Sequence, residues 1–493
     1  MPTDPRLVLV FVVDGLRPDS ITPEDTPTLY RLRAEGVEFT RGHAVFPTVT
    51  RVNAAAIATG TQPGTNGLVG NQMYVPAVDD RRAFDTGNHR NFLALDRASD
   101  GHVLEVPTLA ERLHARGLRL AAVSSGSTGS AFLLNPGSRA GVGALVNGYL
   151  DPGKTVAYPA ALSERILSRL GPAPAKEGGG GRFDAPVGWT QRVLREVVLP
   201  ELAPTVVINW LTEPDHSQHA VGVGSPQARE ALRNGDREIA LVLDTLERLG
   251  LAASTSVLVI SDHGFTTNTA GVDVAGALVT AGLKAAPDST DVVLASSGQA
   301  VALHVEGHDR ERVARLARFV QAQDWGGVLF AGEAVDGAFP LDLIQVANRG
   351  RSPDLLITFP WTSRTNAFGV RGTDLACVGA GGALYASDHG SMSPWNVRNT
   401  FLAWGTRFRK GATVSVPAGN VDVTPTVLAL LGIAGENGLD GRVLTEALDG
   451  GPDPERVAVE TRVHTAAAGA YRAALQISTV DGRRYVDKSW RLS

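Results

Sequence analysis

The chain contains six residues of the types that bind catalytic divalent metals, spread widely along its 493 residues. They are Asp14, Asp215, His219, Asp262, His263 and His389. Carboxylate and imidazole together form the ligand mixture of catalytic zinc and related divalent ions. Three carboxylates and three histidines are enough for two ions with open coordination positions. Because two such ions can clamp the attacking and leaving oxygens of a displacement at phosphorus, these residues predict a phosphoryl-transfer hydrolase.

The three carboxylates share one kind of position. Asp14, Asp215 and Asp262 follow the apolar runs LVLVFVV, VVINWL and SVLVI. These runs are rich in Val and Ile without polar alternation, as in buried parallel strands. Ligands bind at the carboxyl ends of such strands in open α/β sheets. A single Asp–His pair in a turn is more often a surface feature, but three carboxylates placed alike favour a site.

The first half of the chain alternates strand and helix patterns. Strands are predicted at 6–15, 37–46, 118–126, 205–215 and 255–264, and helices at 26–36, 51–60, 106–117 and 225–250. The glycine-containing stretch 171–181 predicts a loop. This alternation predicts an α/β fold with a mostly parallel central sheet and helices on both faces.

The second half contains a block with its own α/β texture. A strand at 299–307, a helix at 309–323 and a strand at 326–332 predict an inserted α/β cap subdomain over 266–380. A strand at 398–405 and a helix at 422–433 then complete a catalytic core formed by 1–265 and 381–445. Residues 446–493 are a C-terminal extension, in which a hairpin is predicted to turn at Asp481-Gly482.

Composition limits the class of protein. The formal net charge of −5, with no stripe of Lys and Arg, argues against a nucleic-acid scaffold. The single cysteine, Cys377, rules out an internal disulfide. No apolar run reaches the roughly 20 residues that span a membrane. Because nothing near Met1 resembles a signal peptide, a cytoplasmic location is predicted, or a periplasmic or secreted one if a leader has been trimmed. The oligomeric state stays open.

A nucleophile is predicted in the segment FPTVTRVNAAAIATG, between a strand and a helix. It offers Thr48, Thr50 and Asn53. A hydroxyl at a helix N-terminus is usually an N-cap. The same helix end also presents N–H groups and a positive dipole to phosphate oxygens, and a neighbouring metal would lower the pKa of the hydroxyl.

These motifs together carry a resemblance to a known family. VFVVDGLRPD, PTVTRVN, ATGTQPGTNGLVGN, WLTEPDHSQH, SDHGF and the second SDHG resemble the alkaline phosphatase superfamily, most closely its nucleotide pyrophosphatase/phosphodiesterase branch, the type I phosphodiesterases. The resemblance covers the motifs from Asp14 to His389 and extends to the helix near 422–433. It implies an alkaline-phosphatase-like fold and hydrolysis of phosphodiester or phosphoanhydride bonds in a small-molecule substrate.

The resemblance also implies a role for each matching residue. One of two divalent ions, zinc by expectation, would be held by Asp14, Thr50, Asp262 and His263, and the other by Asp215, His219 and His389. The family pattern P-T-x-T-x-x-N makes Thr50 the nucleophile that forms a phosphothreonine, and Asn53 a donor to a phosphate oxygen. Manganese or iron could replace zinc under the right supply.

Two positions bear on the substrate. The residue after the nucleophile is commonly aromatic in the nucleotide-cleaving members, but here it is Arg51. Its guanidinium either donates bidentate hydrogen bonds to the substrate or faces away from it. Trp210, five residues before Asp215, would supply one half of a nucleobase sandwich. A phosphomonoesterase or a phosphonate hydrolase is the alternative function. A silent binding module is disfavoured, because every ligand and the nucleophile are present.

Overall fold

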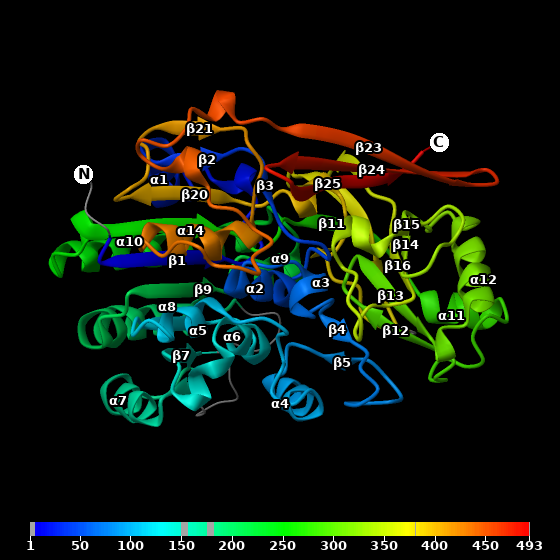
Figure 1. The fold of residues 1–493 in the computed structure, drawn as a ribbon, viewed down its shortest axis with the longest axis horizontal. Coiled ribbons are helices and arrows are strands. Elements are labelled where there is room, and N and C mark those ends of the chain that lie inside the picture. Colours follow the sequence, from blue (N-terminus) through cyan, green and yellow to red (C-terminus); the bar gives the residue numbers. More distant parts are fainter. Residues whose placement is uncertain (1–4, 149–155, 175–181, 380, 493) are drawn as a thin grey trace.

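The computed structural model describes residues 5–148, 156–174, 182–379 and 381–492, so most of the predicted 171–181 loop lies outside the described residues. A nine-stranded sheet runs through the molecule (Figure 1). Its strands, in spatial order, are β21 (Ala412–Val414), β2 (Val37–Phe39), β20 (Phe401–Gly405), β10 (Thr255–Ile260), β1 (Leu7–Val13), β9 (Val206–Leu211), β6 (Leu120–Ser124), β7 (Ala144–Asn147) and β8 (Val156–Tyr158). The run from β10 to β7 is parallel, whereas β20 and β8 pair antiparallel with their neighbours in that run.

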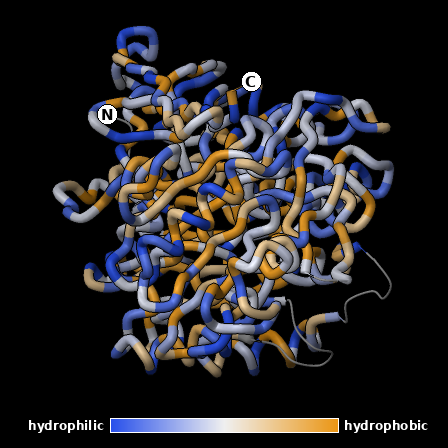
Figure 2. Tube along the Cα trace, turned by 90° about the vertical axis from the view of Figure 1, so that its right-hand side faces the viewer, coloured by the Kyte–Doolittle hydropathy of each residue, from blue (hydrophilic) through white to orange (hydrophobic). Residues whose placement is uncertain are grey.

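The central strand β1 shows why this sheet is buried on both faces. All seven of its residues are buried. Val8, Val10 and Val12 belong to one hydrophobic core, and Leu7, Leu9, Phe11 and Val13 belong to the other. Successive side chains of a strand point to opposite faces, so helices must cover both sides. Figure 2 accordingly shows the hydrophobic segments of the chain, in orange, gathered in the interior of the molecule. The predicted fold class is confirmed.

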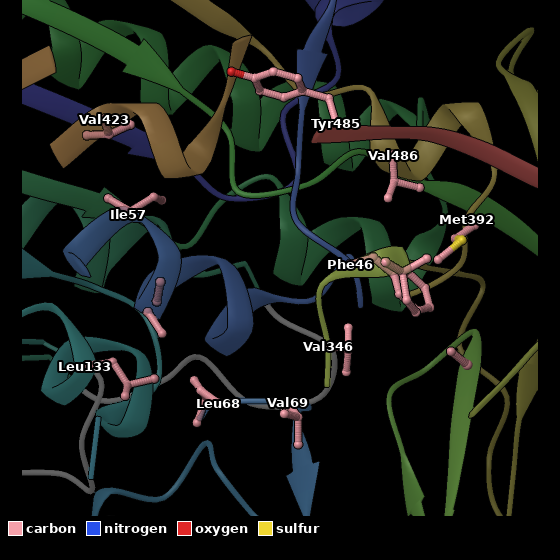
Figure 3. Close-up of a cluster of buried hydrophobic side chains, with 14 of the residues drawn as sticks. Phe46, Ile57, Leu68, Val69, Leu133, Val346, Met392, Val423, Tyr485 and Val486 are labelled. Carbon is pink, nitrogen blue, oxygen red and sulfur yellow. The ribbon is translucent and has the colours of Figure 1, made fainter. Parts of the chain in front are cut away.

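Helices from distant parts of the sequence cover the two faces. One face carries α2 (Thr50–Thr59), α5 (Leu109–His114), α6 (Thr128–Leu134) and α14 (Val423–Leu430). Figure 3 shows side chains of this core, among them Ile57, Leu133 and Val423. The other face carries α1 (Pro27–Glu35), α7 (Ala160–Leu170), α8 (Asp184–Val193) and α10 (Pro226–Arg248). Shorter or outlying helices are α3 (Pro63–Asn66), α4 (His89–Ala98), α9 (Asp215–Val221), α11 (Val274–Thr280), α12 (Arg310–Gln321) and α13 (Pro394–Val397).

The 266–380 block forms a five-stranded sheet of its own at one end of the molecule (Figure 1). Its order is β12 (Val292–Ser296), β13 (Ala300–Val305), β16 (Leu355–Thr358), β14 (Leu329–Ala331) and β15 (Phe339–Pro340). A four-stranded sheet links this block to the core, in the order β17 (Thr362–Thr365), β18 (Arg371–Cys377), β11 (Thr266–Val272) and β19 (Ser387–Asp388). Strands on both sides of the predicted boundary at 380/381 therefore share one sheet, and the domain boundaries stay a prediction.

The C-terminal segment packs on the core as a three-stranded antiparallel sheet. Its strands are β23 (Glu460–Ala468), β24 (Tyr471–Val480) and β25 (Arg483–Arg491). Asp481 and Gly482 join the last two with φ of 48° and 76°, the positive values that a tight two-residue hairpin turn requires. The predicted hairpin is confirmed. The hydroxyl of Tyr485 donates to Asp422 Oδ2 over 2.9 Å and ties the sheet to the start of α14.

One predicted strand is divided in the structure. The segment 37–46 forms β2, in the main sheet, and β3 (Gly42–His43), which pairs with β22 (Ala418–Gly419). At Gly42 a Cβ would lie 2.4 Å from the carbonyl oxygen of Asn399, so only glycine allows the close approach at this break. None of the described helices is long and apolar enough to cross a membrane. The predicted cytoplasmic location stays a prediction.

Candidate metal centre

Three neighbouring parallel strands bring the three predicted carboxylates together. In the sheet order β10–β1–β9, Asp262 lies two residues after β10, Asp14 directly after β1, and Asp215 at the start of α9 after β9. The backbone N–H of Asp215 donates to the carbonyl of Asp14 over 3.1 Å. Because the carboxyl ends of parallel strands meet at one edge of the sheet, these residues converge although their positions in the sequence are far apart.

Each carboxylate keeps one oxygen free of hydrogen bonds. Trp210 Nε1 donates to Asp14 Oδ2 over 2.9 Å, and the backbone N–H groups of Gly15 and His263 each donate to Asp262 Oδ1 over 3.0 Å. Among the described residues, Asp14 Oδ1, Asp262 Oδ2 and Asp215 Oδ1 are buried without a hydrogen-bond donor. Burying an unpaired carboxylate oxygen is costly, so these atoms fit ligands of a cation.

The three predicted histidines are oriented by backbone carbonyls. Nδ1 of His219, His263 and His389 lies 3.0 Å from the carbonyl oxygens of Ser387, Gly264 and Thr48, respectively. A carbonyl oxygen only accepts, so Nδ1 carries the proton and the lone pair of Nε2 is left for a metal. This arrangement is typical of metal-ligating histidines.

The free Nε2 atoms face the free carboxylate oxygens. His263 Nε2 lies 3.0 Å from Asp262 Oδ2, and His219 Nε2 and His389 Nε2 each lie 3.4 Å from Asp215 Oδ1. An unprotonated nitrogen and a carboxylate oxygen are both acceptors, so a cation between them satisfies both. The residues present therefore fit a divalent metal.

The ligands form two adjoining groups. One consists of Asp215, His219 and His389, and the other of Asp14, Asp215 and His263; within each group the ligand atoms lie within 4.8 Å of one another. Asp262 adjoins the second group through His263. The rings of His263 and His389 stack with their centroids 3.6 Å apart and connect the two groups.

Burial and mutual repulsion set the electrostatics of the centre. Burial, followed by the charges of Asp215 and Asp262, raises the pKa of Asp14 well above its ordinary value. Burial, followed by the neighbouring His263, lowers the pKa of His389 well below its ordinary value. For His219, burial lowers the pKa, but the charge and hydrogen bond of Asp215, the charge of Asp388 and the Ser387 carbonyl together outweigh burial and raise the pKa to about 9. A metal ion at Nε2 would take the place of that proton. A bound cation would relieve the repulsion among these carboxylates.

Thr50 lies beside this centre, and Thr48 does not face it. Thr50 is the first residue of α2, and its Oγ1 lies 3.3 Å from His263 Nε2. The hydroxyl and the imidazole are thus within hydrogen-bond distance of each other. Thr48 Oγ1 instead donates to the carbonyl of Ser391 over 2.8 Å and is fully buried. The structure thus brings Thr50 together with all six predicted Asp and His residues.

Asn53 has a different place from the predicted one. Its Nδ2 donates to the carbonyls of Val45 and Val49 over 3.2 and 3.1 Å, and its Oδ1 accepts from Val45 N over 2.8 Å. The side chain is fully buried. Both ends of the amide are occupied in holding the 45–49 loop before the nucleophile, so the structure does not offer Asn53 to a phosphate oxygen.

Trp210 also differs from its prediction. It is fully buried in β9, and its indole N–H is used on Asp14. A ring without exposed surface cannot stack on a substrate. Its position five residues before Asp215 places it under the centre, where it orients a predicted ligand.

A cavity of about 300 Å³ opens at the centre. Its lining includes Thr50, Arg51, Asn71, Asp85, Asp215, His219, Cys377, Leu384, Tyr385 and His389. Arg51 faces this cavity, and its Nη2 lies 3.2 Å from Asp85 Oδ1. A larger cavity of about 650 Å³ beside α14 contains none of the predicted residues.

Asn71 is one of the residues of this cavity that the sequence analysis did not identify. Its Oδ1 accepts from the backbone N–H of Arg51 over 3.2 Å. With the oxygen fixed in this way, the NH2 group remains to donate to a ligand in the cavity. The only sequence signal is a polar residue after the turn GLVG, which is too weak to single it out.

A mostly parallel sheet with an Asp/His centre at the carboxyl edge of three adjacent strands, beside a threonine at a helix start, defines an alkaline-phosphatase-like protein. Residues 8–363 match the model of the type I phosphodiesterase/nucleotide pyrophosphatase family. The chain belongs to this family, and the resemblance seen in its motifs is confirmed.

Curated relatives share part of their length with this chain. Mouse ectonucleotide pyrophosphatase/phosphodiesterase family member 1 is 25% identical over 258 residues, which are 52% of this chain and 24% of the mouse protein. The venom phosphodiesterase of Naja atra is 24% identical over 264 residues, 53% of this chain and 26% of the venom protein. The chain thus matches about a quarter of the length of these relatives.

Solved structures match over a larger share. Human ectonucleotide pyrophosphatase/phosphodiesterase 5 superposes with a TM-score of 0.58 at 16% identity, covering 87% of this chain and 96% of the human one. An inactive variant of the murine protein in complex with AMP gives the same TM-score at 18% identity, covering 87% of this chain and 96% of the murine one. These similarities show the fold.

Proposed function

We propose that the chain hydrolyses phosphodiester or phosphoanhydride bonds of small molecules through a phosphothreonine formed at Thr50. One observation carries the proposal: three buried carboxylate oxygens without donors and the Nε2 atoms of three histidines converge beside the Thr50 hydroxyl. Membership of the type I phosphodiesterase family supports the same reaction class.

Two divalent ions, with zinc as the expected metal, complete the proposal. The ligand sets are Asp14, Thr50, Asp262 and His263 for one ion and Asp215, His219 and His389 for the other. When bound, the ions supply positive charge to the phosphoryl oxygens and lower the pKa of the Thr50 hydroxyl. Nitrogen and oxygen ligands suit zinc, and manganese and iron remain alternatives.

The residues of the chain then perform the displacement in two steps. Thr50 Oγ1 releases its proton to solvent water and bonds to phosphorus, while the bond to the leaving oxygen breaks in line with it; the leaving oxygen keeps the bonding electron pair and takes up a proton from solvent. Water then attacks the phosphothreonine, breaks the Thr50 Oγ1–phosphorus bond and restores the hydroxyl. The Asn71 amide, held by the backbone of Arg51, donates to a phosphoryl oxygen and stabilises the charge that develops there.

A panel of four substrates tests this function. Purified, zinc-loaded protein is assayed with bis-p-nitrophenyl phosphate, a p-nitrophenyl phosphate monoester, a nucleotide p-nitrophenyl ester and a p-nitrophenyl sulfate ester. We expect the diesters to be hydrolysed fastest, the monoester more slowly, and the sulfate ester least. Hydrolysis of the sulfate ester alone, or of none of the four, would contradict the proposal.

A phosphomonoesterase or phosphonate hydrolase is the second candidate, and the observation that favours it is Arg51 in the cavity wall. A monoester dianion carries about one more negative charge than a diester, and charge-assisted hydrogen bonds are worth about 1.5–3 kcal/mol. Asp85 already pairs with this guanidinium. The negative charge of Asp85 weakens the attraction between Arg51 and the second negative charge of a monoester. Diesters therefore remain the preferred class.

The contribution of Arg51 is measured by the variant Arg51→Phe. It should raise the rate on nucleotide diesters relative to the monoester. An unchanged ratio would mean that Arg51 does not set specificity, and a wild-type preference for the monoester would favour the second candidate.

A further inference from the structure

Two large apolar side chains are exposed at the mouth of the metal centre. Leu384 is 41% exposed and Tyr385 is 57% exposed, and both line the cavity that contains Thr50 and His389. The other large apolar side chains that are exposed among the described residues are single positions in the sequence: Tyr30, Leu167, Leu241, Leu249, Phe368, Val463 and Leu492. Two adjacent exposed apolar residues beside a polar centre are therefore a local feature of this cavity and require an explanation.

The Tyr385 ring is anchored next to a predicted metal ligand. Its centroid lies 4.8 Å from that of the His219 ring. The backbone around it is fixed, because Asn268 Nδ2 donates to the Tyr385 carbonyl over 3.0 Å and the N–H of Ala386 donates to the carbonyl of His219 over 3.0 Å. The ring thus lies at a fixed position beside the centre, two residues before β19.

The residues that line the cavity are of two chemical kinds. Arg51, Asn71, Gln72 and Asp85 are polar, whereas Cys377, Val378, Leu384 and Tyr385 are apolar. A phosphoester with its charged phosphoryl group at the metal centre has its substituent against this lining. Leu384 and Tyr385 are exposed and can contact an apolar substituent, whereas Trp210 is fully buried.

We propose that Leu384 and Tyr385 form the docking surface for a flat apolar substituent of the substrate, so that the preferred phosphodiesters carry an aryl group. Tyr385 is then the residue that determines specificity, by stacking on the ring of that group. This inference rests on the proposed function, since it takes the phosphoryl group to bind at the metal centre.

Two inhibitors that differ only in their substituent separate this role from general binding. Phenylphosphonate and methylphosphonate present the same anionic head to the centre and contain no ester bond to hydrolyse. For the zinc-loaded wild type, we expect phenylphosphonate to inhibit about tenfold more strongly than methylphosphonate, the order of effect that a stacked ring produces.

The variant Tyr385→Ala should bring the two inhibition constants to within about twofold of each other without changing that of methylphosphonate, and Tyr385→Phe should retain the wild-type ratio. Phe368→Ala is the matched control, because Phe368 is an exposed aromatic residue outside the cavity lining. An undiminished ratio in Tyr385→Ala overturns the inference, as does a wild type that binds both phosphonates equally. If neither phosphonate inhibits, the proposed function itself fails, and the two failures are thereby distinguished.

Discussion

At the scale of single residues, two threonines in the same motif have separate tasks. Thr50 contacts His263, whereas Thr48 bonds to the 390–391 turn that follows His389. The hydroxyl of Thr50 is therefore available to a substrate, and that of Thr48 stabilises the loop that carries a ligand.

We predict that Thr50→Ala lowers kcat on bis-p-nitrophenyl phosphate by at least about a thousandfold, because each tenfold loss of rate is only about 1.4 kcal/mol of barrier and the nucleophile supplies several times that. Thermal unfolding should change little. Thr48→Ala should instead destabilise the fold, because the loss of its buried hydrogen bonds costs about 1–3 kcal/mol of unfolding free energy and lowers the Tm. Its loss of kcat should be milder than that of Thr50→Ala. The reverse ranking would assign the nucleophile to Thr48.

The indole N–H of Trp210 is predicted to hold Asp14 in position for the metal. Trp210→Phe keeps an aromatic ring in the core but removes the donor to Asp14 Oδ2. Partners of this kind typically change metal affinity by about 10- to 100-fold, so the variant should lose zinc at a lower chelator concentration than the wild type. Trp404→Phe is the control, since it removes an indole donor to Glu35 on the surface. Equal zinc retention in all three proteins would refute the role.

At the scale of elements, strand patterns predicted most of what builds the centre. The apolar runs before Asp14, Asp215 and Asp262 identified β1, β9 and β10, and a parallel sheet has only one carboxyl edge at which they can meet. The hairpin at Asp481-Gly482 was predicted for a similarly local reason, the turn chemistry of two residues.

What the sequence could not predict depends on non-local contacts of side chains. Nothing in its pattern shows that both ends of the Asn53 amide are taken by the 45–49 loop, or that Trp210 points below the centre rather than into the cavity. Asn71 and Tyr385 reach the cavity only through the packing of the β4 (Gln72–Met73) to β5 (Phe84–Asp85) hairpin and of β19.

A buried histidine in β13, His304, is expected to make the 266–380 block sensitive to acid. Burial lowers the pKa of His304 to about 4, so between this value and about 6.5 the unfolded chain binds a proton that the folded chain does not. The free energy of unfolding therefore has its full value, as far as this group is concerned, above about pH 6.5. It falls by up to roughly 3 kcal/mol as the pH drops towards 4.

The variant His304→Gln should lose less Tm than the wild type between pH 7 and pH 4.5, measured by thermal unfolding at both values. His114→Gln changes an exposed histidine of α5, far from β13 in the sequence, and should follow the wild type. An acid shift that is identical in His304→Gln and the wild type would show that other groups account for it.

At the scale of the whole molecule, the candidate metal centre joins distant parts of the chain. Its predicted ligands follow three strands of the main sheet, and His389 lies directly after β19, which belongs to the sheet that links the 266–380 block to the core. Removing the metal should therefore affect stability as well as activity.

We predict close to two metal equivalents in protein purified without chelator, with the ions roughly 4 Å apart. Stripping them should abolish turnover and lower the Tm, because a ligand bound only by the folded state stabilises it and the buried carboxylates would then repel one another. Zinc should restore both. Thr50→Ala keeps the six Asp and His ligands and should show the same Tm shift while remaining inactive. A Tm and a rate unaffected by chelator would contradict the centre.

The spacing of the ligands along the chain also sets an order of events during protein synthesis. Asp14 and His389 are 375 positions apart, and a ribosome adds about 5–20 residues per second. The first ligand therefore emerges roughly 20–75 s before the last. We expect a nascent chain that has not yet extended past His389 to hold metal weakly and to cleave nothing, so that the cell meets this activity only in chains that have been synthesised past His389.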